Sequence, residues 1–223
     1  MYASPRGRNV RDVPLENPQE TTQSSTVSEA TKTNHGILCH SVNSPYQRTE
    51  TQLQVLHPDS YDHARFLKSG AVYRRSQHRY PLVYVLPVAP HLEGQWGNGL
   101  AEVQRLDLHN KHQVICAMPT FSHVPWYANH ATDPTIQQET YLLRSILPFV
   151  DHEYAVDTST RHLLGFSKSG WGAFSLLLRN PERFGKAAAW DAPLGQQTPH
   201  KYGMLEIFAT QENFERYDVW VLL

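Results

Sequence analysis

Short apolar runs recur along most of the chain and predict a series of strands. Residues 51–56 alternate polar and apolar side chains, which is the period of a strand with one buried face. Further strands are predicted where mainly apolar runs lie between turn-forming residues, at Ile37–Cys39, Leu82–Leu86, Gln113–Met118, His162–Gly165 and Lys186–Trp190. The continuous apolar runs 82–86 and 113–118 are typical of strands covered on both faces, as in a parallel sheet.

Two stretches between these strands carry apolar residues at helical spacing. Residues 139–150 place Tyr141, Leu142, Ile146 and Phe149 on one stripe, and residues 170–179 do the same before Asn180-Pro181 ends the helix. An order of strand, helix, strand, helix, strand predicts an α/β fold with a mostly parallel central sheet flanked by helices.

The first 36 residues have a different composition from the rest. They are rich in Ser, Thr, Gln, Asn and Pro and poor in large apolar residues, so they offer little surface to bury against the entropy of ordering. We therefore expect a disordered arm over residues 1–36 and a single domain over residues 37–223.

Charge and composition exclude several classes of function. Lys and Arg total 20 against 21 Asp and Glu, so no basic excess favours nucleic acid or an anionic membrane. No apolar run is long enough to span a bilayer, and the first residues contain no apolar stretch typical of a secretory signal, which favours a cytoplasmic protein. Two cysteines, scattered histidines and the absence of a glycine-rich phosphate loop indicate neither a metal site nor a cofactor.

The chemistry-bearing segment lies where the strand 162–165 runs into the helix that follows. This junction reads Gly165-Phe-Ser-Lys-Ser-Gly170. A serine on such a sharp turn holds its hydroxyl above the sheet, and the helix N-terminus behind it can stabilise an oxyanion. Ser167 is therefore predicted to be a nucleophile. The alternative is a small-residue turn in which Ser167 only caps the helix. Ser169 stands where the motif G-x-S-x-G has its second glycine. Whether the hydroxyl of Ser169 also reaches the site stays open.

The segment GFSKSGWGAFSLLLRNPERFGKAAAWDAPL resembles the nucleophile region of the esterase D group of α/β-hydrolases, which includes S-formylglutathione hydrolases, feruloyl and acetylxylan esterases and mycolyltransferase-like proteins. The similarity covers about residues 50–195 and includes the segments Tyr80–Val88, Phe121–Tyr127 and Glu139–Asp151 with Tyr154. The resemblance implies an α/β-hydrolase fold and hydrolysis of a small-molecule carboxylic ester or thioester through an acyl-enzyme on Ser167.

The resemblance also implies an oxyanion hole and a pocket. Its backbone donors would be Lys168, the residue after the nucleophile, and Val88 or Ala89 in the turn after the strand 82–86. That turn usually carries His-Gly in the family, whereas this chain has Pro87-Val88. Two interpretations stay open for the aromatic residues Trp126 and Tyr127, with His123 and His130 nearby. They could stack on a substrate, or they could pack in the core.

The acid and the histidine of the family come late in the sequence, and this chain ends 56 residues after Ser167. Residues 218–223 resemble a strand cut short, so we expect the last strands to be missing and an open apolar edge beside residues 186–190, which favours aggregation or a homo-oligomer. Asp191 and His200 are the remaining candidates for acid and base. The alternative function is a non-catalytic remnant or truncated product that keeps the pocket without the triad, and that would be slow or inactive as an esterase.

Overall fold

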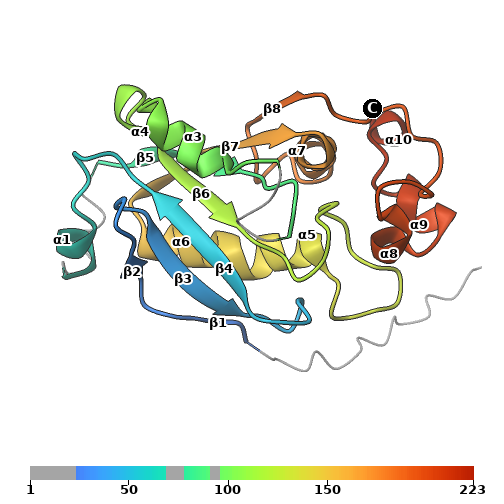
Figure 1. Ribbon diagram of the computed structural model, residues 1–223, viewed down its shortest axis with the longest axis horizontal. Coiled ribbons are helices and arrows are strands. Elements are labelled where there is room, and N and C mark those ends of the chain that lie inside the picture. The colour runs from blue at the N-terminus through green and yellow to red at the C-terminus, as the bar shows by residue number, and fades with distance from the viewer. Residues whose placement is uncertain (1–23, 69–77, 91–95) are drawn as a thin grey trace, which may run out of the picture.

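A computed structural model describes residues 24–68, 78–90 and 96–223. Its centre is an eight-stranded sheet in the order β1-β3-β4-β6-β5-β7-β8, with β2 paired to β3 outside this path (Figure 1). The strands are β1 Thr26–Val27, β2 Thr31–Lys32, β3 Leu38–Asn43, β4 Thr51–Leu56, β5 Tyr80–Val85, β6 Ile115–Pro119, β7 Val156–Phe166 and β8 Lys186–Trp190. Each predicted strand from residue 37 to residue 190 is therefore confirmed, with shifts of a few residues at the ends.

The sheet has a parallel half and an antiparallel half. Strands β6, β5, β7 and β8 run parallel, whereas β1, β3 and β4 are antiparallel to their neighbours. The parallel half agrees with the predicted α/β-hydrolase architecture, and it carries the Ser167 junction at the carboxyl end of β7. Among the described residues, β8 forms the edge of this half.

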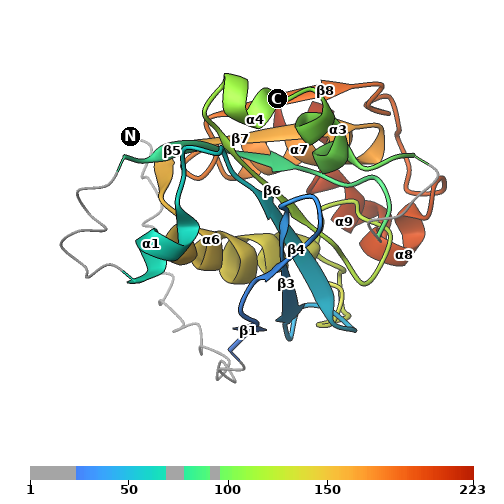
Figure 2. The ribbon, with the colours of Figure 1, turned by 60° about the vertical axis from the view of Figure 1, so that its left-hand side comes forward.

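Helices cover both faces of the sheet, as Figure 2 shows for α3 and α6. Alternate residues of β6 explain why: Ile115 and Ala117 pack among α5, α6 and α7 residues, while Cys116 and Met118 pack against α3. The helices are α1 His63–Lys68, α3 Gly99–Arg105, α4 Leu108–Lys111, α5 Gln138–Tyr141, the π-helical turn η1 Leu142–Ile146, α6 Leu147–Glu153, α7 Lys168–Arg179, α8 Met204–Phe208, α9 Gln211–Glu215 and α10 Val219–Leu222. None of the helices in the described part of the chain has the length and apolarity that a bilayer crossing requires.

The predicted helix over residues 139–150 is present, but η1 interrupts it between α5 and α6. Pro148 lies one turn further on and has no N–H to donate to the carbonyl of Arg144. A wider turn relieves the clash that a proline ring makes with that carbonyl in a regular α-helix.

The expectation of a disordered arm over residues 1–36 is wrong for residues 24–36. Strands β1 and β2 both pair with β3, and Val27 and Ala30 pack against the main core. The Nδ1 of His40 lies 2.8 Å from the carbonyl oxygen of Ser28. The composition of a segment indicates how much apolar surface its side chains can bury. It does not show whether the main chain can form hydrogen bonds with the edge of a neighbouring strand, as it does here. Residues 1–23 lie outside the described residues.

Removing residues 1–36 is therefore expected to destabilise the protein more than removing residues 1–23. The longer deletion takes away both short strands and the small apolar contacts of Val27 and Ala30. A cost of about 1–2 kcal/mol would lower the thermal midpoint by roughly 2–8 °C in a domain of this size. Thermal unfolding of the two deletion variants measures the difference, and equal midpoints would show that the strands add nothing.

The C-terminal segment also differs from the prediction. Residues 218–223 do not form a strand: α10 occupies Val219–Leu222, and the Asp218 side chain caps it by accepting the N–H of Trp220 at 3.0 Å. Helices α8, α9 and α10 gather beyond α7 at one end of the molecule (Figure 1). They pack around Trp126 and Trp171 in a second core cluster. The start of α10 therefore packs into this cluster through Val219, whereas Trp220, Val221 and Leu223 stay exposed.

Candidate active site

Ser167 lies at the junction of β7 and α7 in a conformation that few L-residues adopt. Its φ is 52° and its ψ is −122°. Its N–H donates to the carbonyl of Trp190 at the end of β8, at 3.1 Å, which ties the turn to the neighbouring strand. Although Ser167 occupies the N-cap position of α7, its side chain makes no capping hydrogen bond. The strained turn holds a half-buried hydroxyl that the local backbone does not use, as a nucleophile requires.

Glycines on either side allow the strand and the helix to meet this closely. A Cβ on Gly165 would lie 2.2 Å from the backbone oxygen of Ser169, well inside any allowed contact. A Cβ on Gly170 would lie 3.0 Å from that of Ala189 on β8. The small residues of the junction are therefore needed for the close approach of strand and helix that places Ser167 at the turn.

The second serine of the motif has a structural role. Ser169 is fully buried, and its Oγ both donates to the Phe166 carbonyl and accepts the Phe166 N–H, each at 2.9 Å. These two bonds close the turn around Ser167. The hydroxyl of Ser169 therefore bonds to the main chain of Phe166 and does not reach the site.

Replacing Ser169 with alanine is expected to loosen this turn. The change removes both hydrogen bonds and leaves the buried N–H and carbonyl of Phe166 without that partner, which costs about 1–3 kcal/mol. Chemical denaturation of Ser169→Ala measures the loss. A free energy of unfolding within about 0.3 kcal/mol of the original chain would contradict the assigned role, because losses from buried unsatisfied groups are several times larger.

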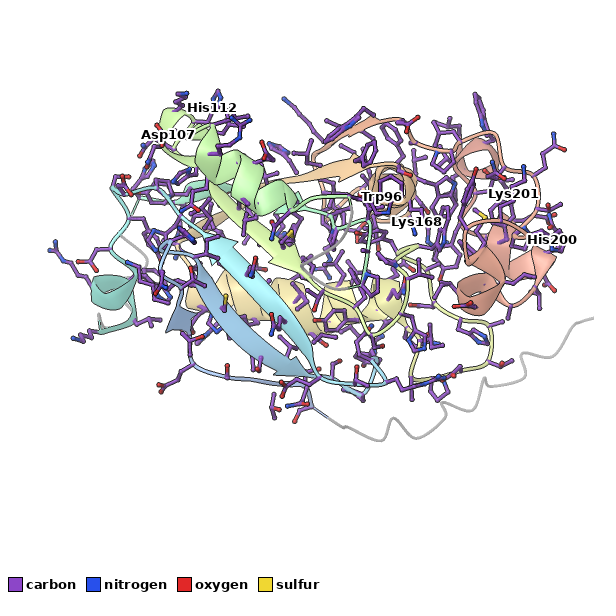
Figure 3. The ribbon with its side chains drawn as sticks, in the orientation of Figure 1. Trp96, Asp107, His112, Lys168, His200 and Lys201 are labelled. Atoms are coloured by element: carbon purple, nitrogen blue, oxygen red, sulfur yellow. The ribbon has the colours of Figure 1, made fainter. Side chains whose placement is uncertain are left out.

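A cavity of about 320 Å³ opens beside Ser167. It is lined by Val88, Trp96, Phe166, Ser167, Lys168, Asp191, Ala192, Pro193 and Tyr202. A second cavity of about 300 Å³ shares Val88, Trp96 and Phe166 with it and extends between α3 and the sheet along mainly apolar side chains. Figure 3 shows Trp96 and Lys168 next to each other near the N-terminus of α7. We refer to the first of these as the Ser167 cavity.

Both residues expected to donate to an oxyanion line the Ser167 cavity. Lys168 is the first residue of α7, where N–H groups have no acceptor within the helix and the helix dipole is positive. Val88 follows Pro87, whose carbonyl accepts the hydroxyl of Tyr127 at 2.6 Å. Tyr127 fits there because Gly172 has no side chain: a Cβ at that position would lie 2.1 Å from the tyrosine ring. Tyr127 thus supports the turn that carries Val88.

The two candidates for acid and base lie apart. Asp191 directly follows β8, has a φ of 52°, and lines the Ser167 cavity with an exposed side chain. His200 is exposed on the loop before α8 and does not line that cavity. Figure 3 shows it beside Lys201, away from Lys168. Among the described residues, no histidine lines the Ser167 cavity, so the structure brings Asp191 but not His200 to Ser167.

The three residues expected to bind substrate do not line the Ser167 cavity either. Trp126 is fully buried, packs edge-on against Trp171 at 5.6 Å between ring centroids, and donates its Nε1–H to the Tyr202 carbonyl. Tyr127 is 1% exposed. His123 bonds to the neighbouring Ser122, and burial lowers the pKa of its imidazole. The packing alternative therefore holds for the two aromatic residues, since buried rings cannot stack on a substrate.

The structure adds two aromatic residues that the sequence did not indicate. Trp96 and Tyr202 line the Ser167 cavity and are 59% and 61% exposed. Tyr202 also has a left-handed φ of 56°, and its carbonyl holds Trp126. Both residues lie in irregular loops, so no periodic pattern marks them, and the only available signal was their aromatic character.

Comparisons with known proteins agree with this fold. No curated protein matches the sequence. Solved structures share the fold: an S-formylglutathione hydrolase from Agrobacterium tumefaciens has a TM-score of 0.64 and 16% identity, with 88% of this chain and 73% of that chain covered. A ferulic acid esterase has a TM-score of 0.56 and 20% identity, with 89% and 70% covered. The fluorophosphonate-binding serine hydrolase FphF from Staphylococcus aureus has a TM-score of 0.58 and 16% identity, with 88% and 73% covered.

A family model described as Esterase, Putative esterase, matches residues 44–223. The match covers most of the chain, including the Ser167 junction, the turn at Val88 and the helices α8 to α10. The chain therefore belongs to this esterase family.

Proposed function

We propose that this protein hydrolyses a small-molecule carboxylic ester or thioester through an acyl-enzyme on Ser167. The observation that carries the proposal is the strained, uncapped Ser167 at the N-terminus of α7, which lines a cavity together with Lys168 and Val88. Strained backbone such as the φ of 52° at Ser167 is concentrated at functional sites, which favours the esterase over a binding remnant. Membership of the esterase family supports the same reaction.

The proposed reaction has two halves. Ser167 Oγ attacks the carbonyl carbon of the ester, its proton leaves to a base, and the carbonyl oxygen becomes an oxyanion held by the N–H groups of Lys168 and Val88. Collapse of this intermediate expels the alcohol or thiol, which takes the proton back from the base, and leaves an acyl-enzyme, which water hydrolyses to the acid and free Ser167. Tyr127, by holding the Pro87 carbonyl, positions the Val88 side of the oxyanion site.

Both halves need a base, which takes the proton of Ser167 in the first half and that of the attacking water in the second. Because no histidine lines the Ser167 cavity in the described part of the chain, we expect this chain to turn over simple esters at below about 1 per second, under the typical enzyme range. Asp191 is the ionisable carboxylate on that cavity and is the proposed acid of the site.

The test is pre-steady-state hydrolysis of 4-nitrophenyl acetate. Because 4-nitrophenolate is a good leaving group, acylation is expected to be faster than hydrolysis of the acetyl-enzyme, which gives a burst of 4-nitrophenol of up to one equivalent per chain and then a slower steady rate. A linear time course with no acetylated protein by mass spectrometry at any time would overturn the acyl-enzyme proposal.

A further inference from the structure

Lys168 lines the Ser167 cavity and has no counter-ion among the residues that the structure describes. Its side chain is half-buried and lines this cavity together with Ser167. No ion pair or side-chain hydrogen bond joins it to any residue in the part of the chain that the structure describes, although Asp191 lines the same cavity. Burial lowers the pKa of the Lys168 ammonium, and no neighbouring carboxylate opposes this shift.

Two other shielded cations of this protein are paired. Arg161 is almost fully buried and bonds to Asp151. Arg179 bonds to both carboxylate oxygens of Glu139, at 2.9 and 3.0 Å. Partial desolvation of a charge that has no partner in the described part of the chain is unfavourable, and a negatively charged group on a ligand would offset it.

The electrostatic surroundings favour an anion at this position. Lys168 begins α7, so the positive end of the helix dipole adds to its own charge. Asp191 contributes the opposite charge, but its side chain is exposed and therefore screened by water and salt. The other described residues of the cavity lining are neutral and mostly apolar: Val88, Trp96, Phe166, Ala192, Pro193 and Tyr202.

We propose that Lys168 makes this esterase selective for esters that carry a carboxylate close to the scissile bond. The inference rests on the proposed function, because it assigns a substrate class to the same site. The backbone of Lys168 would hold the oxyanion, and its side chain would pair with the substrate carboxylate. The carboxylate can belong to the acyl part or to the alcohol part of the ester, and the experiment below separates the two.

The experiment compares kcat/KM for matched anionic and neutral esters. For the alcohol part, 4-acetoxybenzoate is compared with its methyl ester; for the acyl part, 4-nitrophenyl hydrogen adipate is compared with 4-nitrophenyl hexanoate. In Lys168→Met, the anionic-to-neutral ratio is expected to fall about tenfold to hundredfold for one of the two pairs, the range for losing a hydrogen bond to a charged group. Lys168→Arg keeps the charge and is expected to keep most of the ratio.

Lys201→Met is the matched control. Lys201 is exposed, does not line the cavity, and lies with His200 away from Lys168 (Figure 3). This variant removes the same net charge from the protein, so the ratio is expected to stay unchanged. An unchanged ratio in Lys168→Met for both ester pairs, or an equal fall in Lys201→Met, would overturn the inference.

A binding measurement separates this inference from the proposed function. In Ser167→Ala, calorimetric titration with 4-acetoxybenzoate and its methyl ester reports affinity without turnover. Tighter binding of the anion that Lys168→Met abolishes in the same background supports the inference, even if Ser167 proves not to be the nucleophile. Equal binding of the two esters would overturn it, even if Ser167 hydrolyses both.

Discussion

Ester turnover by this chain is expected to fall, when Ser167 is replaced with alanine, to what binding and an oxyanion site supply alone, about a thousandfold to ten-thousandfold over water. The acyl-enzyme cannot form without the Ser167 hydroxyl, so the burst of 4-nitrophenol is expected to disappear. The contributions of a nucleophile and its base are not additive, so all turnover that passes through the acyl-enzyme is lost, however strong the base assistance is. Steady-state hydrolysis of 4-nitrophenyl acetate measures the change.

His200→Ala is the informative companion to Ser167→Ala. His200 is exposed and lies off the Ser167 cavity, so its replacement is expected to leave turnover within about twofold, since surface changes of this kind are worth under about 0.5 kcal/mol. A large loss in His200→Ala would show that the loop before α8 moves to bring this histidine to Ser167. Equal rates for Ser167→Ala and the original chain would contradict the proposed nucleophile.

The largest loss of stability is expected for Gly165→Ala. The added methyl group would lie 2.2 Å from the carbonyl oxygen of Ser169 and 2.6 Å from the nitrogen of Gly170. Both atoms belong to the backbone of the α7 start, so neither can move without opening the turn. We expect a cost of about 3 kcal/mol or more, which lowers the thermal midpoint by roughly 6–12 °C.

Gly195→Ala is the control for this change, because a Cβ at Gly195 meets no atom within 4 Å. Its midpoint is expected to stay within about 2 °C of the original, as exposed substitutions usually cost under about 0.5 kcal/mol. A Gly165→Ala protein that unfolds at the same temperature as the Gly195→Ala protein would show that the junction is less tightly packed than described.

Much of the fold follows from sequence patterns that have one structural meaning. The apolar runs of β5 and β6 can be buried only between two layers, and the stripe of α7 can cover only one sheet face. The predictions were wrong where one sequence pattern is compatible with more than one structure. Residues 24–36 are polar, yet their main chain pairs with the edge of β3. The apolar end of the chain forms α10 rather than a strand because Asp218 caps a helix as readily as it precedes a strand.

The part of the site that neighbouring residues in the chain determine could be predicted from the sequence. The turn around Ser167 depends on residues next to it in the chain, so the glycines and serines of one short segment were sufficient to identify it. The walls of the cavity come from distant loops, and there residue type is ambiguous. Trp126 and Trp96 look alike in the sequence, yet Trp126 is fully buried in the core and Trp96 lines the Ser167 cavity.

Covalent labelling with a fluorophosphonate, read by mass spectrometry of the intact protein and of its peptides, tests the central claim most directly. The reagent needs an activated serine next to an oxyanion site, and it reports one bond-forming event without requiring full turnover. The account predicts a single adduct on the peptide that contains Ser167, and no adduct in Ser167→Ala. An adduct on another residue, or equal labelling of Ser167→Ala, would contradict the assignment of Ser167 as the nucleophile.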